Sequence, residues 1–237
     1  MSKGRSIQRR SIRRILIGTL IGCVIAGLIG LGVWQLQRRV WKLDLIQRTE
    51  AMLRSPPVPA PPPSGWAAIT KDDTYRPVIA TGRYRPDADT YTQAATALGG
   101  GFWVLTPLDT GRFTLLVNRG FVPPDKRGKT PAPTGIVTVR GLLRLTEPDG
   151  GFLRSNLPAE DRWYSRDVAA IATKRGLTNV APYFIDAVAD PKVAWPRGGL
   201  TVVTFRNNHL VYALTWFGLA LLLGGMTWWV ARREPRA

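Results

Sequence analysis

The only histidine of the 237-residue chain, His209, lies where a polar segment gives way to an apolar one. The apolar run that follows it, residues 210–230, carries no charge and ends before Arg232 and Arg233. An ionisable side chain at the mouth of a membrane span is costly to place there, and it is therefore a functional candidate by default. The plainer alternative is an interfacial histidine that only tolerates the lipid headgroup region.

Aromatic, amide and basic side chains accompany this histidine. In a helix that starts at the apolar run, His209, Tyr212 and Trp216 fall at positions i, i+3 and i+7, on one face. If the two membrane helices are antiparallel, the end of the first helix and the start of the second helix lie at the same depth in the membrane. The remaining residues of this cluster are Trp34, Gln35, Arg38, Arg206, Asn207 and Asn208. An aromatic belt with snorkelling arginines would give the same pattern.

Small residues recur in both apolar runs and predict that the two helices pack closely. Because Gly27 and Trp34 share a helix face, we expect a partner helix on the glycine side to meet Trp34. The four-residue ladder in the first run is Gly18, Gly22, Ala26 and Gly30, and the second run offers Gly218, Ala220, Gly224 and Gly225.

The cysteine and histidine content limits the metal chemistry. The only cysteine, Cys23, lies inside the first apolar run. One histidine and one cysteine cannot build a zinc or copper cage of protein nitrogen and sulfur ligands. If His209 binds a metal, the other ligands must arrive with the metal, as in a porphyrin.

Catalytic patterns do not emerge from the sequence. A Ser–His–Asp triad would need His209, and no G-x-S-x-G elbow accompanies it. The carboxylate pairs Asp72–Asp73 and Glu160–Asp161 are sequence neighbours, which point to opposite faces of a strand and make poor acid–base partners. We therefore expect that the protein is not an enzyme.

Residues 15–33 and 210–230 are each long enough to cross a hydrocarbon core of ~30 Å as a helix. The first run lacks a small-residue cleavage site and exceeds a usual signal-peptide core, so we interpret it as an uncleaved anchor. We place the first membrane helix at residues 15–37 and the second at residues 207–230.

The orientation follows from the basic flanks. The tails, residues 1–14 and 231–237, are rich in arginine and lysine, so we expect both termini in the cytoplasm and residues 38–206 outside the inner membrane. The net charge of +17 is scattered and carries no nucleic-acid-binding motif. Anionic lipid headgroups are the expected electrostatic partner, and nucleic acid is not.

The segment between the spans predicts a β-rich domain, either a barrel or a sandwich, with one short helix. The helix is expected at residues 165–174 with Ser165 as its cap, and a hairpin turn at residues 109–111. A proline-rich connector, residues 55–64, is interpreted as a stiff spacer. The expected strands are residues 78–84, 102–107, 113–118, 137–145, 183–188 and 200–205. The fold class is thus a membrane protein with two transmembrane α-helices that flank an extracytoplasmic α+β domain.

Five stretches of the chain closely resemble the surfeit locus protein one family. They are LGVWQLQRRVWKLDLI (31–46), RPVIATGRY (76–84), GFWVLTPL with LLVNRGFVP (101–108 and 115–123), VRGLLRLTEPDGGF (139–152) and NNHLVYALTWFGLA (207–220). The resemblance covers nearly the whole chain in order, with the same two helices around an outer domain. The connector and both tails match nothing in particular.

The resemblance implies an assembly factor for haem–copper terminal oxidases, of the bacterial type, with no enzymatic activity of its own. It implies that the protein binds haem a transiently and delivers it to cytochrome oxidase subunit I, with haem A synthase as a further candidate partner. His209 is then the proposed ligand of the haem iron. The other expected haem contacts are Trp34, Gln35, Arg38, Tyr212, Trp216, Arg206 and Arg119.

Among these contacts, the arginines are expected to pair with the haem propionates. Arg119 has a second interpretation, because its N-R-G context also fits a structural turn in the outer domain. The rival function is a membrane scaffold that binds no haem and stabilises oxidase assembly intermediates. In that case His209 is structural.

Overall fold

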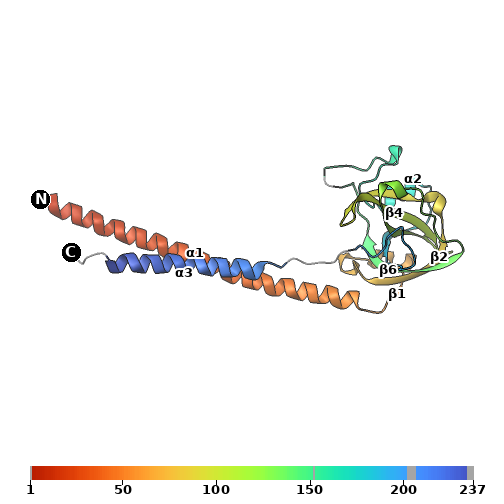
Figure 1. Cartoon of the computed structure of the whole chain (residues 1–237). Coiled ribbons are helices and arrows are strands. Elements are labelled where there is room, and N and C mark those ends of the chain that lie inside the picture. The colour runs from red at the N-terminus through yellow and green to blue at the C-terminus, as the bar shows by residue number, and fades with distance from the viewer. Residues whose placement is uncertain (1, 152, 202–206, 234–237) are drawn as a thin grey trace. The chain divides into compact units, whose positions relative to one another are not determined.

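The computed structural model describes residues 2–151, 153–201 and 207–233 (Figure 1). The chain forms two compact units. The first joins Met1–Arg48 with Thr204–Ala237 and contains the helix pair, and the second is the β domain, Thr49–Val203. This confirms the predicted fold class of two apolar helices around a β-rich domain.

Two long helices, α1 (Ser2–Leu53) and α3 (His209–Arg233), are apolar and long enough to cross a membrane. Helix α3 begins directly after Asn208, whose carbonyl accepts a hydrogen bond from the Tyr212 amide (3.2 Å). Helix α1 does not stop at residue 37, because strong helix formers follow and an i,i+4 ion pair joins Arg48 to Asp44 (2.7 Å). The helix therefore continues past residue 37 to Leu53, through residues that were predicted to lie in the extracytoplasmic segment.

The two long helices pack at Gly32 of α1, which is buried. A Cβ atom built on Gly32 would lie 2.5 Å from a ring carbon of Phe217, so only glycine admits this ring. On α3, Ala213 and Ala220 are buried one heptad apart. The prediction that the glycine ladder of α1 contacts α3 is wrong, since a Cβ atom built on each of its glycines would meet nothing within 4 Å. These glycines are Gly18, Gly22 and Gly30.

The β domain contains seven strands in the order β1-β2-β6-β7-β5-β4-β3. Strand β4 pairs with β5 and also with the end of β2, through Arg83–Asp109 and Tyr84–Leu108, so five strands close into a barrel. The expected alternative of a sandwich is therefore excluded. The strands are β1 (Val58–Pro59), β2 (Pro77–Tyr84), β3 (Thr90–Thr96), β4 (Gly99–Asp109), β5 (Thr114–Val122), β6 (Ile136–Leu145) and β7 (Val180–Ala187).

Side chains alternate between two cores along these strands, as the period of two requires. One core includes Val117, Leu143 and Ile185, and the other packs Leu116 and Phe184 against helix α2 (Val168–Lys174). Strand β5 is buried along its whole length because a core covers each of its faces. Short 3₁₀ helices connect the strands: η1 (Pro63–Ala68), η2 (Lys71–Asp73), η3 (Pro86–Ala88), η4 (Pro124–Lys126) and η5 (Pro158–Glu160).

The predicted cap of the short helix is wrong. Helix α2 begins at Val168, and the Asp167 carboxylate accepts a hydrogen bond from the Ala170 amide (3.1 Å). The hydroxyl of Ser165 instead donates to the Glu147 carbonyl (2.7 Å). Because that bond fixes Ser165 outside the helix, the capping position moves two residues along the chain.

Five of the six predicted strands are confirmed, with ends that differ by a few residues, and so is the hairpin turn after β4. In that turn, the Asp109 carboxylate accepts from the Gly111 amide (2.7 Å), and Gly111 adopts a φ of +77°. The predicted strand at 200–205 starts with two residues that are not in a strand, and residues 202–206 lie outside the described residues. Strands β1 and β3 were not predicted.

The proline-rich connector packs on the barrel, with β1 as an additional strand beside β2. Val58 pairs with Val78 of β2 in parallel, and the Ala60 amide donates to the Ile79 carbonyl (2.9 Å). The carbonyl of Pro61 accepts two hydrogen bonds, one from the buried Tyr183 hydroxyl (2.8 Å) and one from the Trp66 indole (3.1 Å). The extended proline backbone leaves carbonyl groups available to the barrel wall.

Candidate functional site

His209 is the first residue of α3 and is half-buried against α1. Its Nδ1 lies 2.7 Å from Oε1 of Gln35. An amide oxygen can only accept a hydrogen bond, so Nδ1 is the donor in this contact. In the neutral imidazole, a proton on Nδ1 leaves the lone pair on Nε2. The arrangement matches the way proteins hold metal-binding histidines, which donate the second ring nitrogen to an oxygen acceptor. The contact with Gln35 thus orients the imidazole of the one histidine from the neighbouring helix.

Tyr212 and Trp216 follow His209 on the same side of α3, as the i, i+3, i+7 spacing predicts. The side chain of Tyr212 is 54% exposed within the chain, and Trp216 is half-buried. Aromatic faces in these positions can pack against a flat apolar ligand beside the imidazole. Two residues before His209, the buried Asn207 Oδ1 has no hydrogen-bond partner in the described part of the chain.

Trp34 does not lie on the face of α1 that meets α3. Its side chain is 52% exposed. At 3.6 residues per turn it lies about 160° around the helix axis from Gly32, where α3 makes contact. The prediction that a partner helix would meet Trp34 is therefore wrong, because the insertion of Phe217 at Gly32 rotates α1 and brings Gln35 to His209 instead.

The arginines proposed for the propionates differ in their environments. Arg38 is exposed, and its guanidinium carbon lies 4.1 Å from the ring centroid of Trp41. A guanidinium next to an aromatic ring keeps N–H donors with which it can bind an anion. Arg206 lies outside the described residues.

Arg119 is a structural residue of the barrel. It is 8% exposed, and its Nε donates to the Thr106 hydroxyl (2.8 Å). Its terminal nitrogens donate to the carbonyls of Thr130 (2.8 Å) and Pro131 (3.1 Å), and an ion pair joins it to Asp89 (3.4 Å). The N-R-G sequence lies inside strand β5, so its interpretation as a turn is wrong. The interior partners nevertheless give Arg119 a structural role in the barrel.

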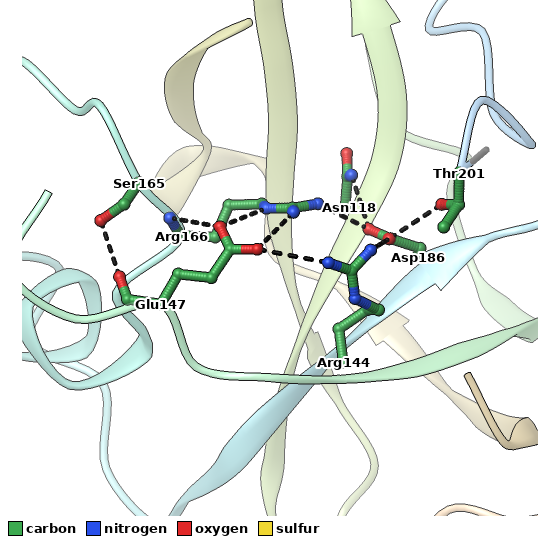
Figure 2. A network of polar contacts seen from close by, with 7 residues as sticks. All are labelled: Asn118, Arg144, Glu147, Ser165, Arg166, Asp186 and Thr201. Carbon is green, nitrogen blue, oxygen red and sulfur yellow. Dashed lines mark hydrogen bonds and ion pairs between the residues drawn. The ribbon is translucent and has the colours of Figure 1, made fainter. Parts of the chain in front are cut away.

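A second polar cluster lies inside the β domain and centres on Asp186 of β7, which is 4% exposed (Figure 2). Its Oδ1 accepts from the Asn118 amide (2.8 Å) and from Arg166 (3.1 Å). Its Oδ2 accepts from Arg144 (2.8 Å) and from the Thr201 hydroxyl (2.9 Å). Both carboxylate oxygens are thus fully used, and the cluster joins β5, β6, β7 and the segment at Thr201.

Glu147 balances the charge of this cluster, because two arginines then face two carboxylates (Figure 2). Arg166 Nε donates to Glu147 Oε2 (2.9 Å), and Arg144 pairs with Oε1 (3.4 Å). Every charged member of the cluster thus has partners of opposite charge. Sequence patterns did not reveal the cluster, because most of its members lie far apart in the chain. Among the described residues, no group of three or more His, Cys, Asp or Glu could hold a metal ion.

Acid should weaken the β domain through Glu147. Burial alone would raise the pKa of this carboxyl, but hydrogen bonds and charge from Arg166, with charge from Arg144, outweigh burial and hold the pKa below its ordinary value of 4.5. A carboxyl with a depressed folded pKa stabilises the fold above pH 4.5, and this contribution is lost as the pH falls through the folded pKa. We expect Glu147→Gln to be less stable than wild type at pH 7 and to lose less stability between pH 5 and pH 3. Urea unfolding across this range measures the difference, and parallel pH profiles for the two proteins would contradict it.

Comparisons with known proteins match the chain over most of its length. The model of the SURF1 family matches residues 22–221, a range that contains both Gln35 and His209. Surfeit locus protein 1 of Homo sapiens is 38% identical over 216 residues, which cover 81% of this chain and 69% of the human protein. The mouse protein of the same name is 37% identical over 214 residues, covering 80% and 67%. A SURF1-like protein of Monosiga brevicollis is 34% identical over 227 residues, covering 86% and 83%.

Proposed function

Because the chain belongs to the SURF1 family, we propose that it is an assembly factor for haem–copper terminal oxidases that binds haem a and delivers it to oxidase subunit I. In this proposal haem a is the cargo, and His209 provides the protein ligand to its iron. Haem A synthase is the proposed donor of the cargo.

The observation that carries the proposal is the hydrogen bond between His209 Nδ1 and Gln35 Oε1. It selects the tautomer in which Nε2 can bind iron, and it orients the ring from the neighbouring helix. A histidine that only faced lipid headgroups would need no such partner. Gln35 therefore acts through His209 and is a positioning residue.

The surrounding residues fit a porphyrin. The porphyrin supplies four nitrogen ligands, so one imidazole is enough on the protein side. Tyr212 and Trp216 offer aromatic faces to the macrocycle, and Arg38 offers donors to a propionate. A single protein–iron bond also suits delivery, because one ligand exchange releases the haem to the recipient.

Delivery to the outer side of the membrane requires that both termini are cytoplasmic, as the basic flanks indicate. We expect a phosphatase that works only outside the cytoplasm to be active when fused after Asp190 and inactive when fused after Ala237. Alkaline phosphatase activity per fusion protein, with protein amounts from an immunoblot, is the measurement. An active fusion at Ala237 would overturn the two-span orientation.

Changing Gln35→Leu should weaken haem binding by about tenfold or more, because the loss of a partner behind a ligating histidine typically lowers metal affinity 10–100-fold. Gln37→Leu is the matched control, since Gln37 is an exposed glutamine two residues away in the same helix. Haem retained per protein after purification, and the optical titration of stripped protein with haem a, are the measurements. Equal haem affinity in the two variants would refute the positioning role.

The scaffold remains the second candidate, and the fully paired cluster around Asp186 is the feature that favours it, because a rigid barrel suits a docking platform. The two functions differ in cargo. Protein purified from cells that make haem a should carry a haem absorption band if it is a carrier, and no band if it is a scaffold.

A further inference from the structure

An apolar groove with a volume of about 490 Å³ lies between the two long helices. Ile25 and Ile29 of α1 line one side of it. The other side comes from α3, and its members include Phe217, Ala220, Leu221 and Gly224. Nearly all of its surface is carbon, and its lining offers methyl groups and one aromatic ring.

Glycine keeps this groove open. A Cβ atom on Gly224 would lie 3.9 Å from Cδ1 of Ile25, which is ordinary contact, and a Cβ atom on Gly225 would meet nothing within 4 Å. Larger side chains would therefore fit at both positions, so close helix packing does not require these glycines. Glycine is also a poor helix former in a helix interior. Two consecutive glycines at these positions leave room for something other than a side chain of this chain.

The groove runs along the same helix pair as the His209–Gln35 contact. At 1.5 Å of rise per residue, Phe217 lies about 12 Å and Gly224 about 22 Å along α3 from His209. At about 100° per residue, the groove residues of α3 lie about 20–160° around the helix axis from His209, whereas Tyr212 and Trp216 lie on the other side of it. A ligand with its head at His209 would therefore reach the groove with an apolar tail that leaves the head at the edge away from Tyr212 and Trp216. Haem a has this form, because its macrocycle carries a farnesyl chain that haem b lacks.

We propose that the groove binds the farnesyl tail of haem a and makes the protein select tailed haem over haem b. This inference rests on the proposed function, and it adds a second point of recognition to the iron bond. A branched isoprenoid chain gains dispersion contacts with Ile25, Ile29 and Phe217, whereas haem b gains none of them. Unspecific filling of the groove by acyl chains of the bilayer is the competing outcome.

The test uses full-length protein in lipid nanodiscs, stripped of haem and titrated optically with haem a and with haem b. Wild type should bind haem a about tenfold more tightly than haem b, a ratio that a few additional packing contacts can supply. Gly224→Leu should fill the groove, lower the affinity for haem a to that for haem b, and leave the affinity for haem b unchanged. Gly225→Leu is a second variant with the same expectation, should Gly224→Leu fail to fold.

Gly27→Leu is the matched control. It introduces the same side chain in α1 at an exposed position, where a Cβ atom meets nothing within 4 Å. This variant should keep the wild-type preference for haem a. A loss of preference as large as in Gly224→Leu would overturn the inference.

The remaining outcomes separate the inference from the function on which it rests. If wild type binds both haems equally well, the groove proposal is overturned and lipid alone occupies the groove. The proposed function in haem delivery would not be affected by this result. Wild type that binds neither haem would refute the proposed function, and the groove proposal with it.

Discussion

His209→Ala is expected to remove most or all of the haem from the purified protein, while the protein itself accumulates normally. The substitution deletes the only imidazole of the chain and with it the proposed iron ligand. Helix α3 should still insert, because its apolar run is unchanged and alanine is a good helix former. Cells that depend on this protein should then assemble less oxidase with its full haem complement.

The measurement is haem per protein by the pyridine haemochrome assay, with protein quantified by immunoblot. Asn208→Ala is the matched control, since Asn208 is an exposed neighbour on the same segment and should retain its haem. Imidazole added to His209→Ala during haem titration should restore part of the binding, because it can replace the missing ligand. Wild-type haem content in His209→Ala would make this histidine a bystander and favour the scaffold.

Asp186→Ala is expected to destabilise the β domain by about 3–5 kcal/mol, the usual cost of removing one partner from a buried ion pair. Arg144 and Arg166 would both lose their partner at β7, and the Asn118 amide and Thr201 hydroxyl would lose their acceptor. Domains are typically stable by only about 5–15 kcal/mol, so the variant should accumulate poorly.

Urea unfolding of the purified variants measures this loss. Asp190→Ala is the control, because Asp190 is an exposed aspartate in the segment after β7 and should cost little. Asp186→Asn should be less harmful than Asp186→Ala, since the amide oxygen still accepts hydrogen bonds. A loss below about 1 kcal/mol in Asp186→Ala would show that the cluster does not stabilise the domain, given what surface substitutions usually cost.

Local patterns in the sequence were sufficient for most elements of the fold. The two spans follow from uncharged runs, and five strands follow from short β-branched stretches between turn residues. The closure of the barrel could not be predicted, because it depends on the pairing of Arg83 with Asp109 between distant strands. The connector was misjudged for a similar reason. Proline-rich composition indicates an extended chain, but only the fold brings Tyr183 to Pro61.

The candidate site was predictable in part. His209 is conspicuous because it is the only histidine, and Gln35 was in the predicted set without a defined role. The role depends on how α1 is rotated about its axis, which the contact of Phe217 with Gly32 decides. The predicted glycine ladder implied a different rotation of α1, in which Trp34 would face α3. The cluster around Asp186 was missed because arginine and aspartate residues dispersed along a sequence are usually solvated.

Pulsed electron paramagnetic resonance of ferric, haem-loaded protein can show whether His209 binds the haem iron, as proposed. Protein labelled only with ¹⁵N-histidine, and purified through a tag that contains no histidine, carries a single labelled imidazole. We expect hyperfine coupling between the iron and this imidazole in wild type, with a changed coupling in Gln35→Leu, where the hydrogen bond to Nδ1 is lost. A haem-loaded wild-type spectrum without any ¹⁵N coupling would contradict the claim.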